Sequence, residues 1–150
     1  MSEGIFETFG KVLLTVFLAG LIGGEREIRH KGAGLRTHVL VGVGSCLIVL
    51  TSFHVSDIYK NVTFVDPSRM IAGVITGIGF LCAGTIIRGG TQIVGLTTAA
   101  TLWIVSGVGI AVGCEHYSAA IIVTLTVFLV LIGLRSVEKK LEKHFNSYSI

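Results

Sequence analysis

The strongest candidate chemistry in this sequence lies in GGEREIRHKGAGLRTH, a charged stretch at residues 23–38 between two apolar segments. A carboxylate at membrane depth is poorly solvated, so it should bind a guanidinium, which can donate two hydrogen bonds to it. We therefore expect Glu25 to pair with Arg36 or Arg88 and so fix the first three helices. Arg29, four residues after Glu25, is an alternative partner if the first helix continues past the membrane surface. A solvated charged loop is the simpler interpretation. The predicted polar cluster consists of Glu25, Arg26, Arg36, Thr37, His38 and Arg88.

A second polar stretch, DPSRM at residues 66–70, has the pattern of a helix start. Asp66 suits the N-cap position, and Pro67 suits the first helical position. Asp66 could also bind a metal, but a hard cation wants several oxygen ligands and few acids are near it in the sequence. We expect a helix cap at the opposite membrane face from Glu25, and whether the chain binds any metal stays open.

Glycine and threonine recur at helical spacing, which is typical of close helix crossings in membranes. Glycine lets two helix backbones approach, and threonine can donate a hydrogen bond across the contact. Thr97 and Thr101 lie on one helical face, so they predict a polar seam that serves packing, with an ion path as the alternative. The residues expected in helix packing are Gly73, Gly77, Gly109, Gly113, Thr97, Thr98 and Thr101, and Gly20 and Gly24 form a further GxxxG pair.

The elements that position these residues must be membrane helices. Of 150 residues, 51% are hydrophobic and only 14% are charged, whereas soluble domains are about one quarter charged. This composition excludes a soluble enzyme, a disordered tail and a nucleic-acid-binding module. The cysteines lack the paired spacing of disulfides or zinc sites, so we expect Cys46, Cys82 and Cys114 to be small core residues.

Five apolar segments of suitable length for membrane helices follow one another along the chain. About 20 apolar residues cross a hydrocarbon core as a helix, and no strand-like alternation of polarity is visible. Two acids precede the only cation of the first segment, so we expect a retained span and no cleaved signal peptide. The sequence predicts an all-α bundle of five transmembrane helices in a single domain, 1–150, with spans at 5–24, 39–55, 70–87, 93–114 and 117–134.

The loop charges predict the orientation of this bundle. Nine Lys/Arg residues lie in the first and third loops and after the fifth span, against two in the second loop and none in the fourth. Positive charge collects on the cytoplasmic side of membrane proteins. We therefore expect the N-terminus outside the cell and the C-terminus in the cytoplasm.

Three segments together closely resemble the signature of the MgtC/SapB family of bacterial inner-membrane proteins: GEREIRHKGAGLRTH, DPSRMIAGVITGIGFLCAGTI and VGLTTAATLW. The resemblance covers residues 20–113. Gly24, Gly32 and Cys82 depart from the residues more usual in the family. Many members carry a cytoplasmic domain that resembles ACT modules, and we expect a short form without it. The resemblance implies functional positions at Glu25, Arg26, Arg36, Thr37, His38, Asp66, Arg88, Thr97, Thr98 and Trp103.

The resemblance implies a multi-pass inner-membrane protein linked to growth in low magnesium and to virulence inside host cells, and some members are thought to restrain the ATP synthase. No catalytic motif is present, so we expect no enzyme, no cofactor and no nucleic-acid partner. The leading hypothesis is a regulator that acts in magnesium limitation or acid stress by contact with bilayer-embedded partners such as the ATP synthase or a transporter. The alternative is a carrier or channel for magnesium or another cation. The three GxxxG pairs also predict a homodimer.

Overall fold

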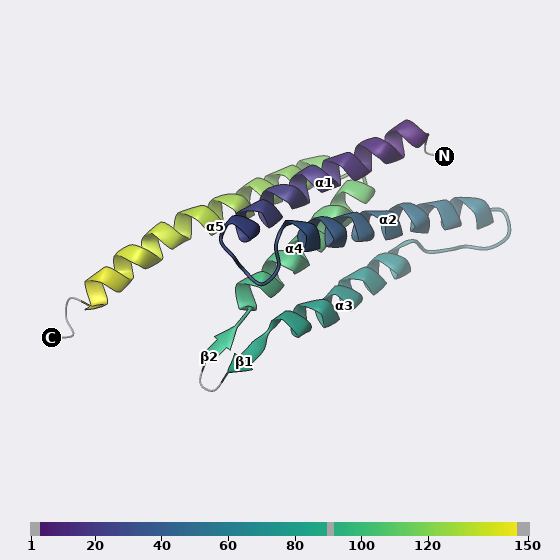
Figure 1. The fold of residues 1–150 in the computed structure, drawn as a ribbon. Helices are drawn as coiled ribbons and strands as arrows, with labels where there is room; N and C mark the ends of the chain where they lie inside the picture. The colour runs from purple at the N-terminus through teal and green to yellow at the C-terminus, as the bar shows by residue number, and fades with distance from the viewer. Residues whose placement is uncertain (1–3, 90–91, 147–150) are drawn as a thin grey trace.

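Five α-helices and one short β-hairpin form the protein (Figure 1). The computed structural model describes residues 4–89 and 92–146, with side chains described as far as Leu134. All five helices are long and apolar enough to cross a membrane, which confirms the predicted all-α bundle. The elements are α1 (Ile5–Ile28), α2 (Leu35–Tyr59), α3 (Ser68–Thr85), β1 (Ile87–Gly89), β2 (Gln92–Val94), α4 (Leu96–Gly113) and α5 (Tyr117–Asn146).

Helices α1 and α2 extend beyond the apolar segments that predicted them. The structure continues α1 to Ile28, whereas the apolar segment ends at residue 24, and α2 begins at Leu35, before the predicted 39. The chain leaves α1 through His30, whose φ is 52°, and re-enters a helix directly after Gly34. The charged residues at the end of α1 are therefore helical and have neighbours one turn away.

The hairpin corrects the predicted bounds of the third and fourth spans, because β1 begins at the last residue of span 70–87 and β2 includes the first residues of span 93–114. Strands β1 and β2 pair antiparallel, with Ile87 opposite Val94 and Arg88 opposite Ile93. Gly95, at φ 95°, then turns the chain into α4, and a Cβ at this position would overlap the carbonyl group of Thr85. A strand of three residues beside a membrane span gives no hydropathy signal of its own, so neither strand could be recognised in the sequence.

Helix α4 lies at the centre of the bundle and contacts the other four helices. Helices α1 and α2 pack on α4 and on each other, and α5 lies along α1 and α4. Helix α3 packs on α4 and α2 at the opposite edge from α5 (Figure 1). In α4, 56% of the residues are buried. In α3 and in the segment Tyr117–Leu134 of α5 only 11% are buried, so these two peripheral helices leave most of their apolar surface outside the bundle.

Close glycine contacts hold α1, α2 and α4 together. A Cβ on Gly23 would lie 2.8 Å from the Cβ of His38, and one on Gly113 would lie 2.7 Å from the Cβ of Val49. Gly109 faces the backbone of Gly42 so closely that any side chain would overlap it. The expected packing role is wrong within this chain for Gly73 and Gly77, because both face open space on the outer side of α3.

The two ends of the bundle carry different connections. We call the end with residues 29–34 and the hairpin segment 86–95 the hairpin end. The other end holds the start of α1, residues 60–67 and the turn 114–116, and we call it the turn end (Figure 1). The predicted orientation places the hairpin end in the cytoplasm.

Candidate functional site

Two adjacent charged residues are buried at the hairpin end of α1. The exposed fraction is 7% for Glu25 and 5% for Arg26. Arg26 Nη2 donates to Thr98 Oγ1 on α4 at 3.2 Å, and its Nη1 lies 3.9 Å from Glu25 Oε2. Glu25 Oε1 accepts a hydrogen bond from Arg29 Nε, one helical turn further along. The guanidinium of Arg26 thus ties α1 to the first turn of α4.

His38 links α2 to the same part of α4 and is fully buried. Its Nδ1 lies 2.8 Å from the carbonyl oxygen of Gly34, so Nδ1 carries a proton and donates. Its Nε2 lies 3.0 Å from Thr101 Oγ1, which in turn donates to the carbonyl of Thr98 at 2.9 Å. A hydroxyl has one proton to donate. If both ring nitrogens are protonated, the contacts of His38 with Gly34 and Thr101 and that of Thr101 with Thr98 can all be hydrogen bonds. If the ring is neutral, Nε2 must accept the hydroxyl proton of Thr101, which can then no longer donate to Thr98.

The cluster retains hydrogen-bonding capacity that the protein does not use. Glu25 Oε2 and Arg26 Nε are buried and have no hydrogen-bond partner among the residues that the structure describes. Buried polar atoms of this kind are rare because each loses its hydration without replacement. Both atoms therefore carry unused hydrogen-bonding capacity at this end of the bundle.

A hollow of about 1040 Å³ adjoins these residues at the hairpin end. The end of α1, the loop after it, the hairpin and the first turn of α4 form its polar walls, and α5 supplies an apolar wall through Val130, Leu131 and Leu134. Glu25 and Arg26 line it from inside, and Arg29 and Lys31 line it nearer the surface.

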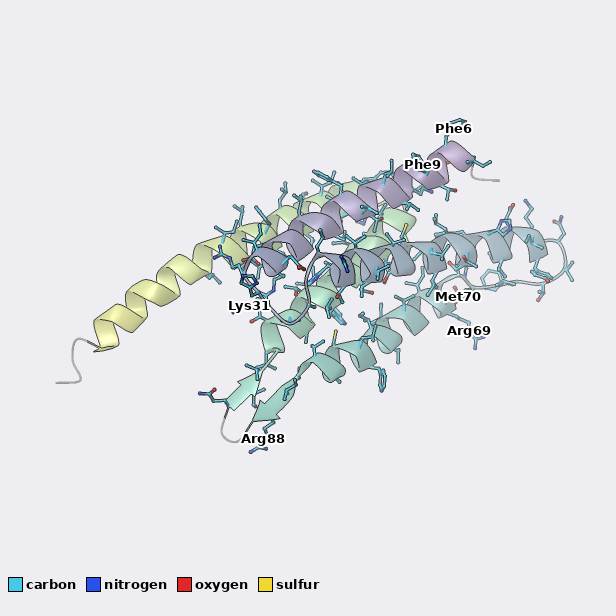
Figure 2. The ribbon with its side chains drawn as sticks, viewed as in Figure 1. Phe6, Phe9, Lys31, Arg69, Met70 and Arg88 are labelled. Carbon is cyan, nitrogen blue, oxygen red and sulfur yellow. The ribbon has the colours of Figure 1, made fainter. Side chains whose placement is uncertain are left out.

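The structure corrects the leading prediction for Glu25, which does not pair with Arg36 or Arg88. Its partner is Arg29, the alternative that depended on a longer first helix, and Arg26 lies 3.9 Å away. Arg36 and Thr37 are exposed, since they lie on the outward side of α2 while His38 points inward. Arg88 is exposed on the hairpin, which carries it away from the bundle (Figure 2). The predicted polar cluster thus reduces to Glu25, Arg26 and His38.

The predicted threonine seam keeps Thr101, but Thr98 takes the place of Thr97 in it. Thr98 and Thr101 are buried and bind Arg26 and His38, whereas Thr97 is exposed. Thr98 and Thr101 are three residues apart on α4 and therefore lie on the same inward face of the helix. Trp103 is 54% exposed on the outer side of the same helix.

Asp66 lies one position further from its helix than predicted. Helix α3 begins at Ser68, with Pro67 as the flanking residue. Asp66 Oδ1 nevertheless accepts the backbone N–H of Ser68 at 2.9 Å. Hydrogen bonds from Ser68 lower the pKa of the Asp66 carboxyl. Within the described part of the chain, no three His, Cys, Asp or Glu residues are grouped as a metal site.

The turn end buries a charge in a different way. Lys11 is buried, and its Nζ lies 2.9 Å from Glu115 Oε1 and 3.3 Å from Glu7 Oε1. Both acids are nearly half exposed. The hydrogen bond from Lys11 lowers the pKa of the Glu115 carboxyl.

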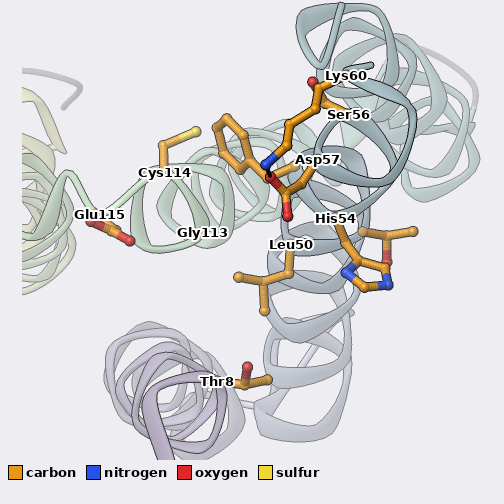
Figure 3. A pocket seen from close by; sticks show the side chains of 11 residues that line it. Thr8, Leu50, His54, Ser56, Asp57, Lys60, Gly113, Cys114 and Glu115 are labelled. Carbon is orange, nitrogen blue, oxygen red and sulfur yellow. Dashed lines mark hydrogen bonds and ion pairs between the residues drawn. The ribbon is translucent and has the colours of Figure 1, made fainter. Parts of the chain in front are cut away.

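Beside this ion pair lies a second hollow, of about 700 Å³ (Figure 3). Its wall carries the exposed ion pair between Asp57 and Lys60, with Nζ to Oδ1 at 2.8 Å, together with His54 and Glu115. Cys114 also lines it and is exposed, which corrects the expectation of three core cysteines; Cys46 and Cys82 are buried. Cys114 lies in the turn after α4, outside the packed helix faces.

Sequence reasoning missed several of these contacts. Gly23 and Gly42 lie at helix crossings, but no glycine stands four residues before or after either of them, so a search for GxxxG pairs does not find them. The pairing of Lys11 with Glu115 joins residues 104 positions apart. The sequence did contain a signal for this pairing, because a lysine inside an apolar span needs a carboxylate at the same membrane face.

Comparison with known proteins shows the family. A family model described as the MgtC family matches residues 12–140. The "Putative magnesium transporter YhiD" of Escherichia coli K12 is 42% identical over 123 residues, which cover 81% of this chain and 57% of that protein. "Protein MgtC" of Salmonella typhimurium LT2 is 36% identical over 132 residues, which cover 88% of this chain and 54% of that protein.

An uncharacterized protein of Haemophilus influenzae is 38% identical over 131 residues. The chain spans about half the length of the curated relatives that it matches. No solved structure matches. With five membrane-length helices and a family match over most of its length, the chain belongs to the MgtC family and is a multi-pass protein of the bacterial inner membrane.

Proposed function

We propose that this protein is a membrane regulator that binds helices of a larger membrane complex when magnesium is limiting or the medium is acidic. One observation carries the proposal: apart from the thiols of Cys46 and Cys82, no ionisable side chain lies in the central part of any span. The segments concerned are 12–24, 39–53, 70–85, 96–113 and 118–134. A cation carrier usually places ionisable groups at the membrane midplane, where its substrate binds.

The outer face of α3 supports contact with a partner helix. Gly73 and Gly77 are spaced by one turn, and a Cβ on either would meet no atom within 4 Å. Small residues at this spacing let a second helix approach closely in the bilayer. The ATP synthase, which the family resemblance implies as a partner, would bind through this face. The same face also serves the predicted homodimer, because Gly109 and Gly113 are already covered by α2.

The link to magnesium comes from the relatives, one of which carries the name of a magnesium transporter. That name supports a rival function, in which this chain itself carries magnesium across the membrane. Backbone carbonyl groups at the hairpin end would then have to supply the ligands, because the central segments offer no carboxylate.

Magnesium flux into liposomes separates the two functions. We expect the purified full chain to give no more uptake than protein-free liposomes, and robust, saturable uptake would overturn the proposal. Crosslinking in native membranes tests the partner directly. The wild-type chain should crosslink to a larger membrane complex, and G73I/G77I should lose that product. The matched control is G133I, because Gly133 on α5 also faces open space. Equal loss in both variants would contradict a specific role of α3.

A further inference from the structure

We propose that the hollow at the hairpin end is a binding site for a phosphate group, supplied either by an anionic lipid or by a small free phosphate. The proposal does not depend on the regulatory function above. It rests on three features of the described residues: the charge of the hollow, the uncapped start of α4 and the buried guanidinium of Arg26.

The charge of the hollow is positive. Arg26, Arg29 and Lys31 line it, and among the side chains that the structure describes Glu25 is the one carboxylate in its wall. Glu25 is already bound by Arg29 and lies 3.9 Å from Arg26. Three cations thus face one anion, which leaves a local excess of two positive charges. A magnesium ion at Glu25 would meet two guanidinium groups, so the same charges disfavour a cation.

The start of α4 adds positive potential to the same wall. Leu96, Thr97 and Thr98 form the first turn and all line the hollow. Gly95 precedes them, and within the described chain no side chain caps this helix. The first N–H groups of a helix lack partners inside the helix, and the helix dipole favours an anion there.

Arg26 supplies the decisive observation. Its side chain is buried, and it binds Thr98 in the first turn of α4, so a cation lies against the positive end of a helix. Its Nε is buried and has no hydrogen-bond partner in the described part of the chain, and the residue lines the hollow. An anion in the hollow would accept from Nε and from the N–H groups of α4, and it would offset the local excess of positive charge.

The walls also fit an amphiphile. Ile87, Ile93 and Val94 of the hairpin are more than half exposed beside the hollow, and α5 adds Leu134. A phosphate group at the surface of a bilayer has acyl chains below it and water above it. The apolar walls would contact the acyl part while the cations bind the phosphate, and a free phosphate would use the polar walls alone.

Two arms of one experiment distinguish the sources. In the first, sodium phosphate is titrated into the full chain in neutral detergent, with sodium chloride at equal ionic strength as the comparison, and the unfolding temperature is measured. In the second, phosphatidylglycerol retained by the protein from mixed nanodiscs is counted by native mass spectrometry against phosphatidylcholine. Saturable stabilisation by phosphate supports a free anion, and selective retention of phosphatidylglycerol supports a lipid. If phosphate gives no saturable stabilisation and phosphatidylglycerol is not selectively retained, the proposal is overturned.

Variants locate the site. K31Q removes an exposed cation of the wall and should weaken binding about tenfold, as expected for one charged hydrogen bond. R26K keeps the charge but removes the buried Nε, and it should weaken binding by a similar factor. R36Q is the matched control, because Arg36 is an exposed arginine at the same end that does not line the hollow. If R26K does not fold, the comparison of K31Q with R36Q still tests the site. Equal weakening of binding in these two variants would overturn the proposal.

Discussion

The two ends of the bundle each bury a cation, but they neutralise it differently. At the turn end, Lys11 lies between Glu7 and Glu115, which remain in contact with solvent. At the hairpin end, Arg26 lies beside a carboxylate that is itself buried and is shared with Arg29. The turn end therefore has two carboxylates around one cation, whereas the hairpin end has three cations around one carboxylate.

This difference shows which end needs something from outside the chain. Solvent-exposed acids can follow the lysine and be hydrated at the same time, so the turn end is satisfied by the protein and water. Buried groups have no such freedom, and two of their atoms at the hairpin end stay without a partner in the described residues. A buried charge contributes to stability only when its hydrogen bonds are complete. The following predictions test the contrast, from the largest expected effect to the smallest.

Labelling of cysteines tests which solution each end meets and should give an all-or-none result. Cys114 is exposed at the turn end, but partial desolvation of its thiol raises the pKa, so labelling is run at mildly alkaline pH. A membrane-impermeant maleimide should label wild-type protein in intact spheroplasts. In a C114S background, K31C at the hairpin end should react only after the membrane is opened. Labelling of K31C in intact spheroplasts would reverse the predicted orientation.

Removal of one charge at each end should produce unequal losses of stability. The variant E25A leaves the buried guanidinium of Arg26 uncompensated and should lower the free energy of unfolding by about 3–5 kcal/mol. The variant K11M leaves two acids that water can hydrate, so its loss should be much smaller. Reversible denaturation in detergent measures both values. Equal losses would remove the distinction between the two ends.

A double-mutant cycle tests which arginine binds Glu25. The coupling between E25A and R29A should be about 1–3 kcal/mol, because it includes a charged hydrogen bond to a buried carboxylate. The cycle of E25A with R88A serves as the control and should be additive, since Arg88 is exposed on the hairpin. Coupling to Arg88 of the same size would show that the hairpin folds back onto the cluster.

The pH dependence of stability should report on the turn end, with the smallest effect of the four. Lys11 lowers the pKa of Glu115 in the folded protein. The stabilisation is therefore fully present above the ordinary pKa of a glutamate and is lost as the pH falls through the lower, folded value. Unfolding midpoints measured across the acidic range should show this loss in wild type, and E115Q should lack that part of it. An identical pH profile for E115Q would exclude the contribution.

The sequence predicted the helices well and the contacts between them poorly, for different physical reasons. A membrane span must be long and apolar, so its existence is encoded locally. The hairpin was missed because each strand has only three residues and both overlap the ends of the predicted spans 70–87 and 93–114. The partner of Glu25 depended on where α1 ends: once the helix reaches Ile28, Arg29 is one turn away.

Glycine contacts show a similar limit. Gly109 and Gly73 both belong to GxxxG pairs, yet one faces the backbone of α2 and the other faces open space. The four-residue spacing of glycines predicts a helix face without side chains, but it does not predict which helix packs against that face. The placement of His38 inward and of Arg36 outward also needed the rotation of α2, which its nearly uniform apolar sequence leaves undefined.

The contact of Gly109 with Gly42 has a mechanical consequence. A slide of α4 along α2 by one helical turn, about 5.4 Å, would in one direction bring Val105, on the same face of α4, to a point where only a hydrogen atom fits. Gly23 and Gly113 block sliding in the same way at the crossings of α1 with α2 and of α4 with α2. These three helices therefore behave as one stiff frame from the hairpin end to the turn end. Helices α3 and α5 have no close glycine contact of this kind among the described residues, so a displacement of either helix against that frame meets less steric resistance than a displacement within it.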